Sequence, residues 1–270
     1  PAVRLSPNAV ICNVSDAKTG CIKAENKDNT KPAFKILEGN RFMTTSAIIE
    51  IENAALSVSD GSGVTDILRG ISVKINTAES VGIVGPSGAG KSSLMMLAGG
   101  LLRPSSGKIV IAGTNLNDLD EDGLAAFRRR HIGIIFQDFH LIPSMTALEN
   151  VAVPLELAGE KNALQIAADS LDRVGLSHRL NHFPAQLSGG EQQRVAAARA
   201  FAPKPEILLA DEPTGNLDGP TGKIVTDLLF DMQKQNKTTM LLITHDLKIA
   251  GLCDRILKIR DGLIDKSDEA

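Results

Sequence analysis

Eight consecutive residues combine glycines, a lysine and a serine at the spacing that binds phosphate groups. They are Gly85-Pro86-Ser87-Gly88-Ala89-Gly90-Lys91-Ser92, which fits the pattern G-x-x-x-x-G-K-[ST] of a P-loop, or Walker A motif. Glycines let successive backbone N–H groups turn toward phosphate oxygens, while the lysine reaches the outer phosphates and the serine hydroxyl ligates Mg²⁺. The stretch therefore predicts a binding site for a nucleoside triphosphate.

The flanking residues supply the setting that a P-loop needs. The apolar residues 81–84 predict a buried strand before the loop, and residues 93–98 predict a helix after it. The positive N-terminal end of that helix would face the phosphates. Because both flanks are present, we favour a phosphate site over a chance glycine-rich turn.

A second segment predicts another helix end that can bind an anion, and it reads Leu187-Ser188-Gly189-Gly190-Glu191-Gln192-Gln193-Arg194. Ser188 and Glu191 have the spacing of a capping box, which places Ser188 at the N-terminus of a helix. Gly189 and Gly190 leave the backbone amides there uncovered, as an anion site requires. Taken alone, the segment is equally consistent with an ordinary helix start.

Two carboxylates, Asp211 and Glu212, directly follow the apolar run 207–210. A continuous apolar run is typical of a parallel strand that is buried on both faces. The carboxylates then fall at the strand's carboxyl end, where open α/β sheets bind ligands. Acids at a strand end can also be structural caps. His245 and Gln137 each end a similar apolar run, and each alone would be a weak signal.

Together these segments resemble the ATP-binding-cassette (ABC) ATPases over roughly residues 48–264, and the resemblance implies ATP and Mg²⁺ as cofactors. In that family an LSGGQ or LSGGE signature binds the γ-phosphate of an ATP held by the P-loop of the other subunit. The resemblance therefore implies a head-to-tail dimer around two ATPs. It also implies an integral membrane permease as partner, and a cytoplasmic protein that is peripheral on the inner face of the membrane.

The resemblance further assigns roles to individual residues. It implies that Glu212 polarises the attacking water, that His245 touches the γ-phosphate, and that Gln137 links the metal or water to the transport partner. With Lys91, these are the implied catalytic residues, and Ser92, Gln137 and Asp211 are the implied ligands of Mg²⁺. The implied ATP-binding residues are Gly85, Pro86, Ser87, Gly88, Ala89, Gly90, Lys91, Ser92, Ser93, Ser188, Gly189, Gly190 and Glu191. The implied dimer-interface residues, which resemble the family's D-loop, are Asn216, Leu217 and Asp218.

Other segments narrow the resemblance within the family. Residues 141–151 and 210–218 resemble the subgroup that contains LolD, MacB and YbbA, whose members drive membrane-anchored permeases with large periplasmic domains. Residues 184–187, 200–201 and 227–230 favour YbbA.

This sequence departs from the family pattern at the position that would bind the adenine base. The family commonly stacks this base on an aromatic residue before the P-loop, and that place falls at or near Val58. No Phe occurs between Met43 and Lys91, and the chain has no Trp or Tyr. We expect weakened recognition of the base but intact binding of the phosphates. The alternative is that a neighbour such as Arg69 covers the base.

Composition limits the possible partners. A formal net charge of -3 argues against a nucleic-acid partner, since such domains are normally basic. Cys12, Cys21 and Cys253 are too few and too scattered for a disulfide framework or a zinc site, which favours a reduced, cytosolic compartment. No apolar run reaches the ~18 residues of a membrane span, so a membrane role would need a partner chain.

The expected fold is α/β: a P-loop NTPase domain of the ABC ATPase type. It would have a mostly parallel core sheet, an N-terminal antiparallel β-subdomain and an inserted all-helical subdomain at about residues 139–187. We expect this domain to span residues 43–270, after a disordered or non-native extension at residues 1–42, for which a regulatory tail is the alternative. Strands are predicted at residues 48–56, 70–75, 81–84, 108–112, 132–136, 207–210, 240–244 and 256–260.

Three functions remain in competition. The first is the energising subunit of a transporter or mechanical permease complex. The compact helical insertion of this chain suits docking to a permease through Phe139, Leu141, Ile142 and Met145. Those side chains could instead pack the subdomain itself. The second is a soluble cassette ATPase of DNA repair or translation, which would carry long insertions or two cassettes. The third is a binding module without hydrolysis, which would lack Glu212 or His245.

Overall fold

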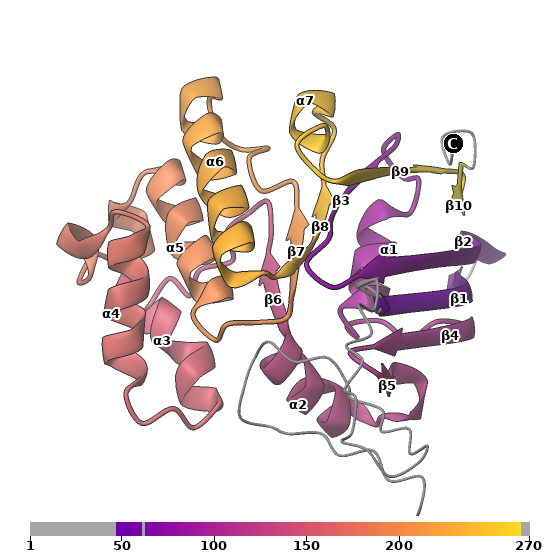
Figure 1. The fold of residues 1–270 in the computed structure, drawn as a ribbon, viewed down its shortest axis with the longest axis horizontal. Coiled ribbons are helices and arrows are strands. Elements are labelled where there is room, and N and C mark those ends of the chain that lie inside the picture. Colours follow the sequence, from indigo (N-terminus) through magenta and orange to yellow (C-terminus); the bar gives the residue numbers. More distant parts are fainter. Residues whose placement is uncertain (1–46, 61–62, 266–270) are drawn as a thin grey trace, which may run out of the picture. The chain divides into compact units, whose positions relative to one another are not determined.

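A computed structural model describes residues 47–60 and 63–265, which form two β-sheets with helices packed between and around them (Figure 1). The expectation for residues 1–42 lies outside the described residues. The first sheet has the order β2-β1-β4-β5 and is antiparallel. Its strands are β1 (Ala47–Asp60), β2 (Gly63–Asn76), β4 (Ser106–Ile111) and β5 (Thr114–Asn115). This sheet is the antiparallel β-subdomain expected from the resemblance.

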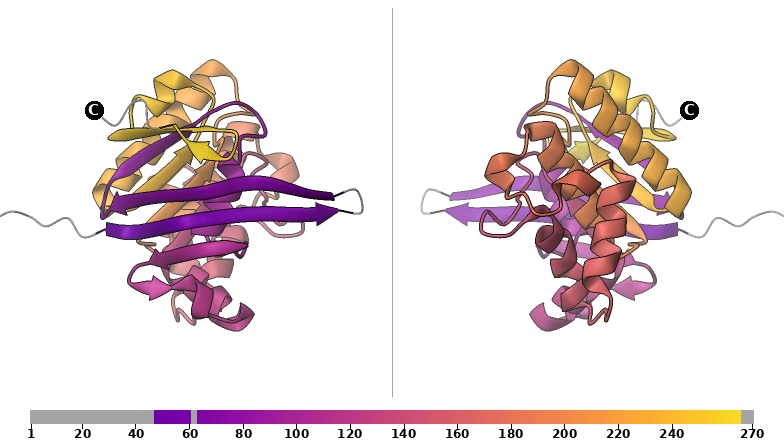
Figure 2. Two further views of the ribbon diagram at one scale, coloured as in Figure 1. Left: turned by 90° about the vertical axis from the view of Figure 1, so that its right-hand side faces the viewer. Right: turned by 90° about the vertical axis from the view of Figure 1, so that its left-hand side faces the viewer.

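The second sheet has the order β10-β9-β3-β8-β7-β6 and is parallel except for the β9–β10 edge. Its strands are β3 (Ser80–Val84), β6 (Ile132–Ile135), β7 (Ile207–Asp211), β8 (Thr239–Ile243), β9 (Arg255–Arg260) and β10 (Leu263–Ile264). All eight predicted strands are present, with ends shifted by a few residues. The largest shift is in β1 and β2, whose hairpin runs past β4 (Figure 2).

The central strands of this sheet divide their side chains between two hydrophobic cores. In β7, Ile207 and Leu209 belong to a core around α1 (Lys91–Ala98), where the two sheets face each other. Leu208 and Ala210 point to the opposite face, into a core shared with helices α3 to α6. This explains the unbroken apolar run in the sequence, because a strand covered on both faces has no solvent side.

The remaining helices are α2 (Glu121–His131), α3 (Ala147–Leu157), α4 (Ala163–Arg173), α5 (Gly189–Phe201), α6 (Gly219–Asn236) and α7 (Leu247–Ala250). The predicted capping box of Ser188 with Glu191 is confirmed at the start of α5, and Thr146 with Glu149 forms another at the start of α3. Within residues 47–60 and 63–265, none of the helices is both long and apolar enough to cross a lipid bilayer.

The expectation of an all-helical segment at about residues 139–187 was wrong at the start of that segment. Residues 139–146 form an irregular loop, since Phe139 and His140 have positive φ angles of 59° and 45°. The buried Asn150 side chain holds the loop through Ile142, accepting from its N at 2.7 Å and donating to its O at 3.1 Å. Leu141 packs against the core shared with helices α3 to α6. For this side chain, the alternative that it packs the subdomain itself is confirmed.

Candidate nucleotide-binding site

Residues 85–90 form the turn between β3 and α1, and two of its glycines occupy places that a side chain could not. Gly85 has a φ of 154°, and a Cβ there would collide with the carbonyl oxygen of Ile259. Gly90 has a φ of 97°, and a Cβ would lie 2.6 Å from Leu68 Cδ2. Such backbone angles are readily adopted by glycine alone, so both glycines are needed to keep the turn tightly wound at the start of α1.

The Lys91 ammonium group lies over the same turn. Its Nζ donates hydrogen bonds to the carbonyl oxygens of Gly85 and Pro86, both at 2.9 Å. The positive end of α1 begins at this residue. A lysine charge beside a helix N-terminus and a glycine-rich turn forms an arrangement that attracts phosphate oxygens.

A cleft of about 670 Å³ brings this turn together with the residues that follow β6, β7 and β8. Gln137 follows β6, Asp211 ends β7 with Glu212 directly after it, and His245 follows β8. These side chains therefore meet although they lie far apart in the sequence. Pro86 and Ala89 belong to the turn but lie outside the lining. The lining residues are Ile67, Gly85, Ser87, Gly88, Gly90, Lys91, Ser92, Ser93, Gln137, Asp211, Glu212, Ile243 and His245.

The donor set of the cleft fits Mg²⁺. Ser92, Gln137 and Asp211 all line it and offer a hydroxyl, an amide and a carboxylate oxygen. Mg²⁺ usually takes one or two carboxylates together with substrate phosphates, and retains waters. The described residues contain no cluster of three or more His, Cys, Asp or Glu side chains that could hold a metal by itself. Mg²⁺ held by the hydroxyl, amide and carboxylate oxygens would complete its coordination with phosphate oxygens and waters.

Glu212 is held in an unusual backbone conformation at the end of β7. Its φ is 45°, and its N donates to Ile243 O at 2.9 Å. Its Oε2 lies 2.8 Å from Nδ1 of His245, and the exposed fractions of the two side chains are 17% and 75%. Left-handed backbone at a non-glycine residue stores strain and often marks a functional site. The carboxylate is thus aimed into the cleft beside an imidazole that solvent or substrate can reach.

The loop after β6 is held by two side chains from other parts of the chain. The Asn216 amide donates to Gln137 O at 3.2 Å and to Asp138 Oδ1 at 2.8 Å, and Gln137 Nε2 donates to Asn216 Oδ1 at 3.2 Å. The Arg199 guanidinium donates to the carbonyl oxygens of Phe139 at 2.8 Å and His140 at 2.6 Å. Burial holds the pKa of Arg199 below its ordinary value. Sequence reasoning missed Arg199, since no local pattern marks a contact over 60 positions.

The signature segment lies outside the cleft lining. Ser188 caps α5, and its Oγ accepts a hydrogen bond from Glu191 N at 3.3 Å. Leu217 approaches the same helix end, since a Cβ on Gly189 would lie 3.4 Å from Leu217 Cδ2. Asp218 caps the next helix, α6, by accepting from Thr221 N at 2.8 Å. The helix start predicted from the capping box is thus present, with Ser188 exposed, Gly189 half-buried and Gly190 buried.

Val58 lies on β1, opposite Thr65 of β2, and its side chain is 49% exposed. Ile67, two residues along β2 from that partner, is the residue of this hairpin that lines the cleft. An aliphatic side chain thus occupies the edge of the cleft that the hairpin forms.

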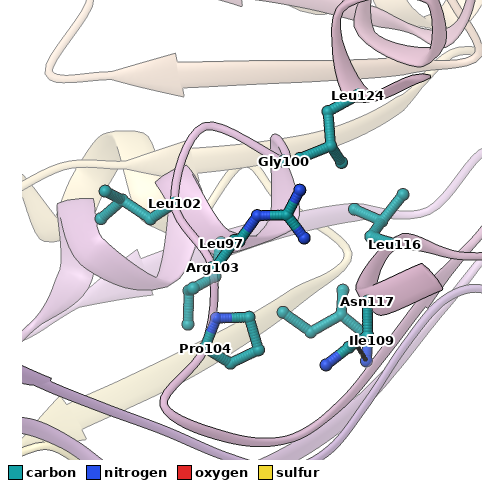
Figure 3. Close-up of a pocket in the computed structure, with 9 residues that line it drawn as sticks. All are labelled: Leu97, Gly100, Leu102, Arg103, Pro104, Ile109, Leu116, Asn117 and Leu124. Carbon is teal, nitrogen blue, oxygen red and sulfur yellow. Dashed lines mark hydrogen bonds between the residues drawn. The ribbon is translucent and has the colours of Figure 1, made fainter. Parts of the chain in front are cut away.

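A second, smaller cavity of about 180 Å³ lies between the end of α1, β4 and α2 (Figure 3). Its lining is mainly aliphatic, with Leu97, Ile109 and Leu124 among its residues. Arg103 is held at its edge by Leu119 O at 2.7 Å and Glu121 Oε1 at 3.1 Å. The phosphate-binding turn and the acidic strand end belong to the larger cleft, which is therefore the candidate site.

Residues 68–215 match the sequence profile of the family described as ABC transporter. The chain is 45% identical over 222 residues to the uncharacterized ABC transporter ATP-binding protein YbbA of Escherichia coli (strain K12), a match that covers 82% of this chain and 97% of that protein. It is 44% identical over 224 residues to the lipoprotein-releasing system ATP-binding protein LolD of Hahella chejuensis, with the same coverage of 82% and 97%.

Solved structures show the same architecture. The dimeric structure of MJ0796, described as a bacterial ABC transporter cassette, has a TM-score of 0.75 and 38% identity, over 81% of this chain and 97% of that chain. A dimeric structure of the same cassette in a post-hydrolysis state, bound to ADP and Pi, has the same TM-score, identity and coverage.

Proposed function

This chain belongs to the ABC transporter family, and from that premise we propose that it is the ATP-hydrolysing, nucleotide-binding subunit that powers a membrane permease. The observation that carries the proposal is the single cleft in which the P-loop, the acidic end of β7 and His245 meet. A module that only bound ATP would not need Glu212 aimed into this cleft with an imidazole beside it.

The cleft residues suggest how hydrolysis proceeds. Lys91 and the amides of the turn would bind the β- and γ-phosphates of ATP, and Glu212 would orient a water for in-line attack on the γ-phosphorus. His245, within hydrogen-bond distance of Glu212, would contact the γ-phosphate and keep the carboxylate in place. Mg²⁺, held by Ser92, Gln137 and Asp211, would neutralise charge on the phosphates.

We also propose that the working unit contains a second copy of the chain. The signature residues Ser188 to Glu191 lie at the N-terminus of α5, outside the cleft lining, and we propose that they contact ATP held by the P-loop of the partner subunit. Asn216, Leu217 and Asp218 would lie at that interface. The LolD relatives are named as parts of a lipoprotein-releasing system, and by analogy this chain would act from the cytoplasm on a permease at the inner face of the membrane. Export, lipoprotein release and mechanical work in the cell envelope are the candidate tasks.

The substitution Glu212→Gln tests this proposal. The amide keeps the shape of the side chain but loses the charge that orients water, so hydrolysis should fall by about 10²–10⁴-fold. ATP binding should remain, and Mg²⁺-ATP should trap a dimer that size-exclusion chromatography with light scattering detects. Co-purification of the tagged full chain with a membrane protein tests the permease. A Glu212→Gln chain that stays monomeric with ATP, or hydrolyses at near the wild-type rate, would contradict the proposal.

A further inference from the structure

Glu191 places a negative charge at the helix end that the proposed function assigns to a phosphate. Its Oε2 accepts hydrogen bonds from Ser188 N at 2.8 Å and Ser188 Oγ at 2.9 Å. These bonds, and Ser188 N above all, hold the pKa of Glu191 below its ordinary value, so the carboxylate is ionised. Like charges repel at short range, so an uncompensated carboxylate here would oppose the binding of a γ-phosphate.

Arg179 supplies the opposite charge from a different element. It ends the short 3₁₀ turn Ser177–Arg179, and its Nε lies 3.0 Å from Glu191 Oε1. The other side of the guanidinium is also held, since its Nη1 lies 3.0 Å from Nε2 of His182. Because Arg is a donor alone, Nε2 of His182 is the acceptor of this bond. The guanidinium is therefore fixed at Oε1 of Glu191, while Ser188 binds the other carboxylate oxygen, Oε2.

The segment that carries Arg179 is itself anchored. Ala147 N, at the start of α3, donates to His182 O at 2.8 Å, and Leu148 N donates to Leu180 O at 3.0 Å. The side chains of Arg179 and Glu191 are 35% and 15% exposed, so the pair is partly shielded from solvent. Partly buried pairs are screened by salt much less than exposed ones.

We propose that Arg179 is a positioning residue for the signature segment, because it neutralises Glu191 so that the α5 helix end can accept the γ-phosphate of ATP held by a partner subunit. This inference rests on the proposed function. It predicts that Arg179 is needed only while Glu191 carries its charge. A purely structural clamp between the 3₁₀ turn and α5 predicts instead that Arg179 is needed whichever residue occupies position 191.

The test is a double-mutant cycle on ATP-driven dimerisation in the full Glu212→Gln chain, in which hydrolysis is expected to be slow. The variants are Arg179→Gln, Glu191→Gln and their combination, and sedimentation velocity with Mg²⁺-ATP gives the dimer Kd. Arg179→Gln should weaken the dimer by about tenfold or more, the equivalent of about 1.4 kcal/mol. Once Glu191 is replaced by Gln, the further change Arg179→Gln should alter the Kd by less than about threefold, since the coupling disappears with the charge.

Controls separate this effect from a general loss of structure. Arg173→Gln removes an exposed arginine near the end of α4 and should leave the dimer Kd unchanged. Binding of a labelled ATP analogue to the monomer should also be unchanged by Arg179→Gln, because the P-loop is not touched. Glu191→Gln keeps a capping box, since Gln is equally suited to that position.

The outcomes are distinct. An Arg179→Gln dimer as tight as the parent, or an Arg179→Gln change that weakens the dimer equally when Glu191 is replaced by Gln, would overturn the inference while leaving the proposed function standing. If Arg179→Gln alone fails to fold, the combined variant decides: one that folds and dimerises supports the inference, and one that fails overturns it. A parent Glu212→Gln chain that does not dimerise with ATP would overturn both.

Discussion

At the scale of single residues, the site depends on a few groups whose identity is fixed by space as much as by charge. Gly85 and Gly90 are required by the atoms around them, and Lys91 is held by the carbonyl oxygens of the turn it serves. Among the residues that the structure describes, no comparable set of contacts holds a side chain that would recognise the base. Ile67 is the residue of the hairpin that lines the cleft, and Val58 presents another aliphatic side chain on the neighbouring strand.

We therefore expect weak discrimination between purine nucleotides. Stacking of a base on an aromatic ring contributes about 1–3 kcal/mol, so GTP should bind within about tenfold of ATP in the wild type, because the P-loop contacts phosphates alone. Val58→Tyr should tighten ATP binding by about 1 kcal/mol or more. Competition of GTP against a labelled ATP analogue measures both effects.

Val64→Tyr is the matched control, since Val64 is a second exposed valine of the same hairpin, 71% exposed. It should not change nucleotide affinity. A strong preference for ATP in the wild type that Val58→Tyr leaves unchanged would show that another side chain covers the base.

At the scale of elements, the loop after β6 is joined to α5 through Arg199, whose hydrogen bonds fix two residues with left-handed backbone. Arg199→Met should remove both bonds and leave two carbonyl oxygens unpaired. Since a hydrogen bond to a charged group contributes about 1.5–3 kcal/mol, we expect the free energy of unfolding to fall by at least about 2 kcal/mol.

Hydrolysis should fall as well, because Gln137 lies in the same loop, two residues before Phe139. Arg199→Lys should not restore it, since one ammonium group cannot reproduce the planar two-pronged geometry of the guanidinium. Urea unfolding and steady-state ATPase rates measure the two effects, with exposed Arg130→Gln as the control. An Arg199→Met chain with wild-type stability and rate would show that the loop keeps its shape without this anchor.

The same loop shows which part of the structure could not be predicted from the sequence. Strands and helix starts were predictable because their determinants are local: β7 is an unbroken apolar run, and Ser188 and Glu191 are three positions apart. The P-loop, Asp211, Glu212, Gln137 and His245 were found by motif, and they meet in the cleft as strand ends do. The course of residues 139–146 was not predictable, because it depends on Asn150 and Arg199, whose bonds come from tertiary packing.

At the scale of the whole molecule, the proposed dimer makes each ATP site a composite of two chains. Ser188→Arg should abolish hydrolysis while the P-loop of the same chain still binds nucleotide, since Ser188 lies outside the cleft lining. Lys91→Ala should abolish hydrolysis through the P-loop itself.

Mixing the two inactive chains should then restore activity. In a Ser188→Arg/Lys91→Ala heterodimer, one site has an intact P-loop facing an intact signature segment, and the other site has neither. Steady-state ATPase measurements on equimolar mixtures, compared with each variant alone, test this. Full activity of either variant alone, or a mixture that stays inactive although heterodimers form, would contradict the composite site.

The way β7 and β8 divide their side chains has a consequence for how the molecule melts. Leu241 and Ile243 of β8 belong to the core around α1, while Met240 and Leu242 belong to the core against α3 to α6. Neither core can lose its packing without exposing the strands that the other one needs. Residues 47–265 should therefore unfold in one heat-absorption peak, with a calorimetric enthalpy equal to the van 't Hoff enthalpy, and the helical insertion should have no transition of its own.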